Sequence, residues 1–368
     1  MVNFRKFTIN PVQKPFMQRL QLLTAWLHSQ FPDQTFTLAP ASADASFRRY
    51  FRATFADGAT RIIMDAPPPH EDCRPLLHIG KLFEDAGTHV PHVYAQDLKQ
   101  GFLLLSDLGN TTYLQALNAG TARELYGAAT DALIRIQLAS KENELPPYDE
   151  ALLRRELNLF PEWYIAKHLN VTLTEKQRGK LEEVFKRILT NNLAQPRVYV
   201  HRDYHSRNLM YIETPHLNPP PPAGEETNER GDFLISPGIL DFQDAVYGPI
   251  TYDLASLFKD AYIKWEEAQI IDWLIRYWEK ARKAGLPVHD DFSEFYRDYE
   301  WMGVQRHIKV LGIFARLYHR DGKDGYLKDM PLVMSYLRAA CARYIDLKPL
   351  LNLLDELEPH GNKVGYTF

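Results

Sequence analysis

Three polar residues have the types and the spacing that phosphoryl transfer requires. Asp203 and Asn208 lie five positions apart, shortly after the apolar run 197–200, and Asp241 ends a second apolar stretch further along the chain. A carboxylate can accept the proton of an attacking hydroxyl group. An amide oxygen and a second carboxylate can hold Mg²⁺ against a triphosphate. We therefore predict Asp203 as the catalytic base and Asn208 and Asp241 as ligands of Mg²⁺.

Each of these residues also has a purely structural interpretation. Asp203 could cap a helix or lie at the surface, and Asn208 could cap a turn. A buried aspartate at the end of a strand is costly without a cation, which favours the metal interpretation for Asp241. Asp244 could take a second metal, orient a substrate or cap the next turn. Asp253 precedes a helical run, where it could cap the helix.

The histidines beside Asp203 have several possible roles. We expect His201 to organise the loop through hydrogen bonds and Arg202 to support the loop electrostatically. His205 could face the acceptor or lie at the surface, and we predict that it binds substrate together with Asp244. Ligation of zinc by His201, Asp203 and His205 is a rival interpretation, but zinc hydrolases need more histidine ligands than this pattern offers.

A predicted helix around residues 301–318 carries three basic residues on one side. Arg306, Lys309 and Arg316 lie on a different face from the apolar stripe of this helix. A solvated charged face is the simplest interpretation of this pattern. The alternative is a cationic wall for an anionic group of the substrate, and we predict Arg306 as a substrate-binding residue on that basis.

Composition sets the broad class of the protein. The chain has 368 residues, 45% hydrophobic residues and a net charge of −4, values typical of a cytoplasmic globular protein without broad nucleic-acid binding. Its two cysteines are far apart in sequence, so neither a disulfide framework nor a zinc site is expected. We expect no signal peptide, no membrane attachment and no obligate protein partner.

The order of the expected elements divides the chain in two. We expect a helix at 15–31, a β-hairpin with strands at 47–55 and 60–65 around Asp57 and Gly58, a helix at 72–87 and a buried strand at 101–105. From about residue 111 the pattern is mostly helical. The segment 214–236 contains four consecutive prolines and a polar run, which indicate a solvated insertion or, as a minority interpretation, a peptide-docking segment.

Several of these segments together resemble a known superfamily. The segments 49–52, 103–109, 201–208 and 240–255 are similar to the aminoglycoside phosphotransferase-like kinases. Within that superfamily, the segments 63–68, 201–205, 240–245 and 305–317 resemble the bacterial anomeric N-acetylmuramate/N-acetylglucosamine kinases. The similarity covers residues 42 to 330. It implies a bilobal α+β protein-kinase-like fold with a small N-lobe built on an antiparallel sheet and a larger, mainly helical C-lobe.

The resemblance also implies a role for Asp253, which would brace the loop that carries Asp203, and it implies boundaries and an activity. The nucleotide-binding lobe would span residues 1–105, a hinge 106–110, and the catalytic and substrate-binding lobe 111–368. The activity would be ATP- and Mg²⁺-dependent phosphorylation of the C1 hydroxyl of an N-acetyl amino sugar, in peptidoglycan recycling. ATP would lie between the lobes, with backbone near Ser106 and Leu108 at the adenine and Ser46 and Arg49 at the phosphates.

One departure from the kinase pattern keeps alternatives open. Met64 occupies the position at which the third strand usually provides a phosphate-binding lysine. We expect one of Arg48, Arg49 and Arg52 to replace that lysine, and strand alternation with an assumed register favours Arg49. A nucleotide-binding pseudokinase remains an alternative, as does another small-molecule kinase acting on an aminoglycoside, choline or homoserine.

Overall fold

The computed structural model describes residues 14–43, 48–68, 70–212 and 236–358. The chain divides into two compact units, the first formed by Met1–Lys81 with Pro91–Leu108 and the second by Leu82–Val90 with Gly109–Phe368. This division does not test the roles predicted for the segments 1–105, 106–110 and 111–368, which stay predictions. The proposed insertion at 214–236 lies outside the described residues except for its last position.

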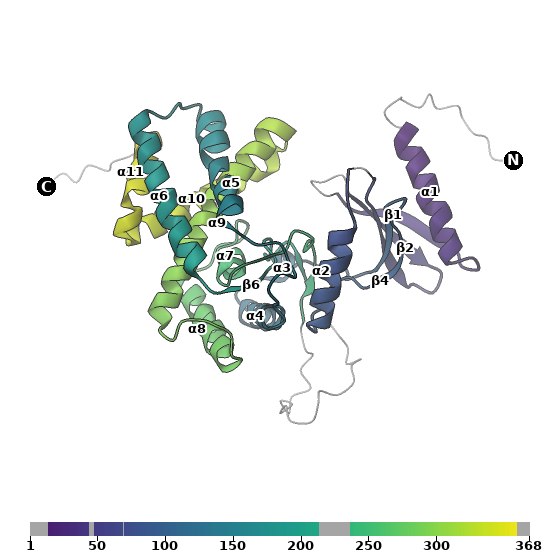
Figure 1. Ribbon diagram of the computed structural model, residues 1–368. Coiled ribbons are helices and arrows are strands. Elements are labelled where there is room, and N and C mark those ends of the chain that lie inside the picture. The colour runs from purple at the N-terminus through teal and green to yellow at the C-terminus, as the bar shows by residue number, and fades with distance from the viewer. Residues whose placement is uncertain (1–13, 44–47, 69, 213–235, 359–368) are drawn as a thin grey trace. The chain divides into compact units, whose positions relative to one another are not determined.

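A five-stranded antiparallel sheet forms the first unit (Figure 1). Its strand order is β1-β2-β3-β5-β4, with the bounds β1 (Phe36–Ala43), β2 (Arg49–Phe55), β3 (Thr60–Asp65), β4 (Val93–Asp97) and β5 (Phe102–Ser106). The turn between β2 and β3 contains Gly58 at φ +85°, a value that glycine adopts without a steric penalty. The predicted hairpin and the predicted strand at 101–105 are confirmed, whereas β1 and β4 were not predicted.

The two faces of this sheet have different neighbours. Side chains alternate along a strand, so Phe51 and Ala53 of β2 share one face with Ile63 of β3. This face packs against Leu23 and Leu27 of the helix α1 (Lys14–Gln30), which confirms the predicted amphipathic helix near the N-terminus. The other face is the one that carries Met64 and Arg52.

The second unit is mainly helical (Figure 1). The helix α2 (Arg74–Asp85) begins in the first unit, and its last four residues belong to the second. The other helices are α3 (Tyr113–Ala116), α4 (Ala122–Leu138), α5 (Glu150–Leu159), η1 (Phe160–His168), α6 (Glu175–Ala194), α7 (Tyr252–Phe258), α8 (Glu267–Lys283), α9 (Phe292–Asp321), η2 (Asp324–Asp329), α10 (Met330–Arg343), η3 (Ile345–Leu347) and α11 (Lys348–Leu357).

Two short strand pairs carry the loops of interest in this unit. The strand β6 (Arg197–Val200) pairs antiparallel with β9 (Val246–Pro249), and β7 (Leu209–Met210) pairs antiparallel with β8 (Gly238–Ile239). The segment 201–208 therefore joins β6 to β7, and the segment 240–245 joins β8 to β9. Each of the two polar motifs lies in a loop whose two ends are fixed by strand pairing.

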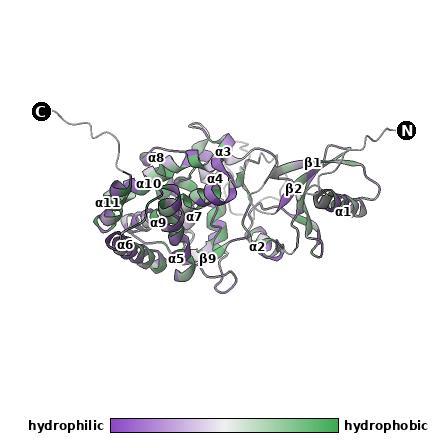
Figure 2. Ribbon diagram, turned by 90° about the horizontal axis from the view of Figure 1, so that it is seen from above, coloured by the Kyte–Doolittle hydropathy of each residue, from purple (hydrophilic) through white to green (hydrophobic). Residues whose placement is uncertain are grey.

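The helix α9 is the centre of the second unit. Nearly every residue from Asp298 to Ala315 is buried, because α5, α6, α7, η1 and α10 all pack against it. The outer helices α6 and α11 instead combine hydrophilic and hydrophobic residues (Figure 2). Within the described part of the chain, no helix is long and apolar enough to cross a membrane.

Gly312 marks the closest approach between α9 and the helix α5. A Cβ atom at this position would lie 2.5 Å from the backbone carbon of Leu159. We expect Gly312→Ala to lower the free energy of unfolding by about 1–3 kcal/mol through overpacking, as measured by denaturant unfolding. Gly179 is the control, because it lies in an exposed part of α6 with nothing within 4 Å of an added Cβ atom. Gly179→Ala should raise the stability by about 0.4–1 kcal/mol, and an equal response of both variants would contradict the packing argument.

Candidate active site

Asp253 fixes the start of the loop that carries Asp203. Its two carboxylate oxygens accept the backbone N–H groups of His201, at 2.7 Å, and Arg202, at 3.0 Å. Burial raises the pKa of Asp253 to about 7, although the two N–H groups act in the opposite direction. The predicted bracing role is confirmed. The helix-capping alternative is wrong, because Thr251 is the N-cap of α7 and Asp253 lies within its first turn.

His201 joins the two motif-bearing loops to each other. Its Nε2 lies 2.9 Å from the carbonyl oxygen of Leu240, and its Nδ1 lies 3.2 Å from the backbone nitrogen of Asp203. A carbonyl can only accept and an N–H group can only donate, so the proton is on Nε2 and the ring is neutral. Burial lowers the pKa of His201 to about 4, in agreement with a neutral ring. His201 is thus the hydrogen-bonding organiser predicted from the sequence, and neither ring nitrogen is free to bind zinc.

Asn208 and Asp241 lie side by side next to Asp203. Nδ2 of Asn208 donates a hydrogen bond of 3.0 Å to the backbone carbonyl of Asp203 and lies 3.4 Å from Oδ2 of Asp241. The backbone N–H of Leu240 donates to the carbonyl of Asn208 at 2.9 Å, and Nε2 of Gln243 donates to Oδ1 of Asp241 at 2.8 Å. The predicted base and the two predicted metal ligands therefore form one cluster.

The backbone conformation is unusual at both loops. Arg202 and Asp241 have φ values of +77° and +63°, in the left-handed region. Residues other than glycine adopt this region rarely, although aspartate and asparagine do so more often than arginine. Among the described non-glycine residues, only Asn143 and Asn170 share this feature. Such conformations persist where surrounding contacts hold them, and they concentrate at functional sites. For Arg202 the holding contacts come from Asp253 and from a second carboxylate in α5.

That carboxylate is Glu156, which sequence reasoning missed. Its Oε1 accepts from Nη2 of Arg202 at 2.5 Å and from Nζ of Lys309 at 3.0 Å. Its Oε2 accepts from the hydroxyl of Tyr148 and, at 3.1 Å, from Nε2 of Gln305. Burial raises the pKa of Glu156, but Lys309 and Arg202 outweigh this effect, and the pKa lies below its usual range. Because Glu156 lies in an ordinary helical pattern with arginines beside it, the sequence offers no signal that would have identified it.

The solvated face predicted for Arg306 and Lys309 is wrong. Both side chains are buried, because α9 is enclosed by other helices. Lys309 pairs with Glu156 and also donates a hydrogen bond of 2.9 Å to the hydroxyl of Tyr252. Arg316 is partly buried. The periodicity of a helix shows which residues share a face. It does not show whether the charged residues on that face lie in water or are buried against opposite charges on other elements.

Asp203 is ionised at neutral pH. Burial raises its pKa, but Lys309, His205, His201 and Arg202 together lower the pKa below its usual range. An ionised carboxylate can accept a hydrogen bond from the hydroxyl group of an acceptor and orient that group for attack. The environment of Asp203 therefore suits the role of a base better than that of a proton donor.

The two other predicted substrate residues near this loop differ in exposure. His205 is partly buried beside the ring of Tyr262, at 5.5 Å between ring centroids, and its buried Nδ1 has no hydrogen-bond partner within the described residues. Asp244 is exposed, and its backbone carbonyl accepts from Nη1 of Arg202 at 3.2 Å. Contact of His205 or Asp244 with a substrate stays a prediction.

The residues predicted to bind nucleotide belong to the first unit. The backbone N–H of Ser106 donates a hydrogen bond of 2.9 Å to the carbonyl of His92, and the backbone N–H of His92 donates one of 2.9 Å to Oγ of Ser106. Leu108 is the last residue of this unit. Ser46 lies outside the described residues. Nucleotide binding by these residues and by Arg49 stays a prediction.

The register of β2 does not support the preference for Arg49. Arg49 lies opposite Asp65 and binds its carboxylate, on the sheet face that packs against α1. Arg52 lies on the same face as Met64 and binds the carboxylate of Asp107 at 2.5 Å. The predicted alternation, with Arg49 and Arg52 on opposite faces of β2, is confirmed, but the sequence does not fix which of these faces meets a helix.

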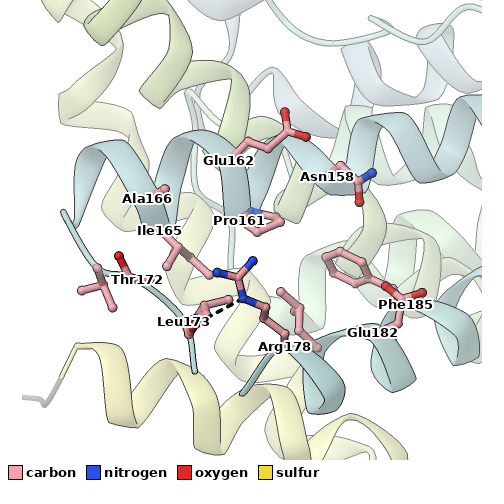
Figure 3. Close-up of a pocket in the computed structure, with 12 residues that line it drawn as sticks. Asn158, Pro161, Glu162, Ile165, Ala166, Thr172, Leu173, Arg178, Glu182 and Phe185 are labelled. Carbon is pink, nitrogen blue, oxygen red and sulfur yellow. Dashed lines mark hydrogen bonds between the residues drawn. The ribbon is translucent and has the colours of Figure 1, made fainter. Parts of the chain in front are cut away.

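A separate pocket of about 440 Å³ lies between η1 and α6 (Figure 3). Asn158 and Glu162 line one side of the pocket, and Arg178 and Phe185 line the other. Arg178 extends across the opening and donates a hydrogen bond of 3.2 Å to the carbonyl of Leu173. None of the predicted site residues lines this pocket.

Comparisons with known proteins place this geometry in a family. Residues 37–217 and 234–291 match the phosphotransferase enzyme family. The chain is 49% identical to the N-acetylmuramate/N-acetylglucosamine kinase of Neisseria meningitidis serogroup B over 96% of this chain and 100% of that protein. It is 47% identical to the protein of the same name from Pseudomonas putida, over 92% of this chain and 97% of that protein.

Solved structures share the fold at low sequence identity. A choline/ethanolamine kinase family protein from Mesorhizobium loti matches with a TM-score of 0.59 and 13% identity, over 92% of this chain and 99% of that chain. The ADP-bound aminoglycoside phosphotransferase APH(2'')-Ib matches with a TM-score of 0.55 and 14% identity, over 86% and 97% of the two chains. The predicted α+β fold, with an antiparallel sheet in the N-terminal unit and a mainly helical C-terminal unit, is confirmed.

The matches to the family and to the two bacterial relatives lead to one conclusion. The chain belongs to the phosphotransferase enzyme family and is a kinase.

Proposed function

We propose that this kinase transfers the γ-phosphoryl group of ATP to the C1 hydroxyl group of N-acetylmuramate and N-acetylglucosamine, in peptidoglycan recycling. The observation that carries the proposal is the near-full-length similarity, at 47–49% identity, to two bacterial proteins that bear the name of this activity. A third protein of that name, from Caulobacter vibrioides, is 31% identical over 68% of this chain.

Asp203 is the proposed base of this reaction. The loop that holds it is fixed at the backbone by Asp253 and His201 and at the side chain of Arg202 by Glu156. A rigid loop keeps the carboxylate in one position, so the acceptor hydroxyl is oriented for attack without further reorganisation. His205, Asp244 and Arg306 are the proposed contacts to the sugar.

The donor set near Asp203 fits Mg²⁺. Asn208 donates through Nδ2 to a backbone carbonyl, so its Oδ1 is the atom that would bind the metal, and the amide group lies beside the carboxylate of Asp241. Oxygen ligands of this kind are the ones that Mg²⁺ prefers. When bound, Mg²⁺ neutralises charge on the triphosphate. Ser106, Leu108, Ser46 and Arg49 are the proposed contacts to ATP.

The identity of the acceptor separates this proposal from its main alternative. Kinases for aminoglycosides, choline or ethanolamine share the fold, as the solved structures show, and the catalytic residues alone do not select an acceptor. Those acceptors are cationic, whereas the buried side chain of Lys309 adds positive charge near Asp203, and the buried side chain of Arg306 adds it near His205. This charge favours a neutral or anionic acceptor.

ATP consumption over a panel of acceptors tests the proposal. The panel contains N-acetylmuramate, N-acetylglucosamine, an aminoglycoside, choline, ethanolamine and homoserine, each with ATP and Mg²⁺. We expect turnover with the two amino sugars at the highest kcat/KM. A higher kcat/KM with any of the cationic acceptors would overturn the proposal, and binding of ATP without turnover on any acceptor would favour a pseudokinase.

A further inference from the structure

Arg306 combines deep burial with an incomplete set of hydrogen bonds. Its exposed fraction is 4%, and its Nη1 has no hydrogen-bond partner within the described residues. Removing a cation from water is costly unless an anion or several acceptors replace the water. The neighbouring buried cation Lys309 meets this requirement through Glu156 and the hydroxyl of Tyr252. Arg306 has no comparable contact at Nη1.

The position of Arg306 on α9 directs it toward the catalytic loop. Lys309, three residues later, binds Tyr252 at the start of α7, and Nε2 of His307 lies 3.4 Å from the carbonyl oxygen of Lys259, just after α7. Arg306 lies between these two side chains on the helix surface, so it faces α7 and the segment that follows it. That segment contains Asp260, whose carboxylate binds Ser206 in the catalytic loop.

Two carboxylates in the same neighbourhood as Arg306, those of Asp253 and Asp260, already have hydrogen-bond partners. Asp260 accepts the N–H and the hydroxyl of Ser206 at 3.0 and 2.5 Å, and Asp253 accepts two backbone N–H groups of the catalytic loop. His205, two residues after Asp203, also has a buried nitrogen, Nδ1, for which the described part of the chain offers no hydrogen-bond partner. Burial lowers the pKa of His205, and Arg306 adds to this effect while Asp260 and Asp203 oppose it. Arg306 and His205 therefore share one neighbourhood next to the base.

We infer that Arg306 binds an anionic oxygen of the acceptor, specifically the carboxylate of N-acetylmuramate, and so distinguishes this substrate from N-acetylglucosamine. The inference rests on the proposed function and concerns the same site. N-acetylmuramate is N-acetylglucosamine with a lactyl ether at the oxygen of C3, and the lactyl group ends in a carboxylate. A guanidinium group is well suited to bind a carboxylate, because two parallel N–H groups can meet the two oxygens.

An anionic oxygen at this place could also belong to the phosphoryl group in transfer. The two sources predict different kinetics. A contact to the lactyl carboxylate matters only for N-acetylmuramate, whereas a contact to the phosphoryl group matters equally for both sugars. The comparison of the two sugars in one variant therefore distinguishes the two sources.

The test measures kcat/KM of the wild type and of Arg306→Gln for three acceptors: N-acetylmuramate, its methyl ester and N-acetylglucosamine. A hydrogen bond to a charged group contributes enough that the variant should lose about 10- to 100-fold with N-acetylmuramate. Its kcat/KM with N-acetylglucosamine, which lacks the carboxylate, should fall much less than its kcat/KM with N-acetylmuramate. The wild type should prefer the acid to the ester, and the variant should not distinguish them. Arg297→Gln is the matched control, because Arg297 is an exposed arginine on the same helix.

The remaining outcomes are also decisive. Equal losses with both sugars in a variant that melts like the wild type would overturn the inference and assign Arg306 to the phosphoryl group. If Arg306→Gln does not fold, the wild-type kcat/KM values for N-acetylmuramate and for its methyl ester still test the inference. Equal values for the acid and the ester would overturn it. Arg306→Lys keeps the charge and should recover part of the preference for the acid. A wild type that phosphorylates neither sugar would refute the proposed function itself, a result distinct from any of these.

Discussion

Replacement of Asp203 by asparagine should lower kcat by about 100- to 10,000-fold, the range typical of general-base contributions. Asparagine has nearly the same shape and can still accept a hydrogen bond, but it cannot take the proton of the acceptor hydroxyl. ATP affinity and the melting temperature should change little, because the backbone of the loop is held by Asp253, His201 and Glu156 rather than by the carboxylate of Asp203. Steady-state kinetics and calorimetry with ATP measure these quantities.

The pH profile adds a second check on the same residue. Because the pKa of Asp203 lies below its usual range, its carboxylate keeps its charge to a lower pH than an ordinary aspartate does. A decrease of kcat as the pH falls just below neutral would therefore not arise from protonation of Asp203. Asp272→Asn is the matched control, since Asp272 is an exposed aspartate paired with Arg276 on α8. If Asp203→Asn kept a kcat close to that of the control, the assignment of the base would be wrong.

Replacement of Asp241 by alanine should abolish the effect of Mg²⁺ on ATP affinity. Asp241 is the carboxylate next to Asn208, so its removal leaves an amide oxygen as the remaining ligand of the proposed pair. Titration calorimetry of ATP with and without Mg²⁺ measures the effect directly, independently of turnover. In the wild type ATP should bind more tightly with Mg²⁺, and in the variant the two affinities should agree.

The same experiment contains its own control. Gln243 binds the other oxygen of Asp241, so Gln243→Ala removes a supporting contact but keeps the ligand. That variant should retain most of the Mg²⁺ dependence. If Mg²⁺ increased the ATP affinity of Asp241→Ala as much as that of the wild type, Asp241 would not be a metal ligand.

Local signals predicted the elements that position the site. The β2–β3 hairpin follows from alternation around Asp57 and Gly58, and the cluster of Asp203, Asn208 and Asp241 follows from spacing after apolar runs. These features depend on residues that are close in sequence or on chemistry that restricts the residue types. The strands β1 and β4 were not predicted, because they form through pairing with neighbouring strands of the sheet and their own residue pattern does not indicate a strand.

Long-range partners could not be predicted. Glu156 lies 46 residues before Arg202, and its pairing with Arg202 and Lys309 depends on how α5 and α9 pack. The same packing turns the basic side of α9 inward, where the sequence favoured a solvated face. The face of β2 on which Arg49 lies could not be predicted for a related reason, since the face that meets α1 is fixed by tertiary contacts. Residue types therefore predicted the chemistry, and packing determined which charges support it.

The position of the new phosphate on the sugar tests the central claim most directly. N-acetylglucosamine labelled with ¹³C at C1 is incubated with ATP, Mg²⁺ and the enzyme, and the product is examined by ¹³C and ³¹P NMR. We expect the C1 signal to split through coupling to phosphorus, and the methyl glycoside, whose C1 oxygen is blocked, to remain unphosphorylated. An unsplit C1 signal together with phosphate at another hydroxyl group, or turnover of the methyl glycoside, would contradict the account.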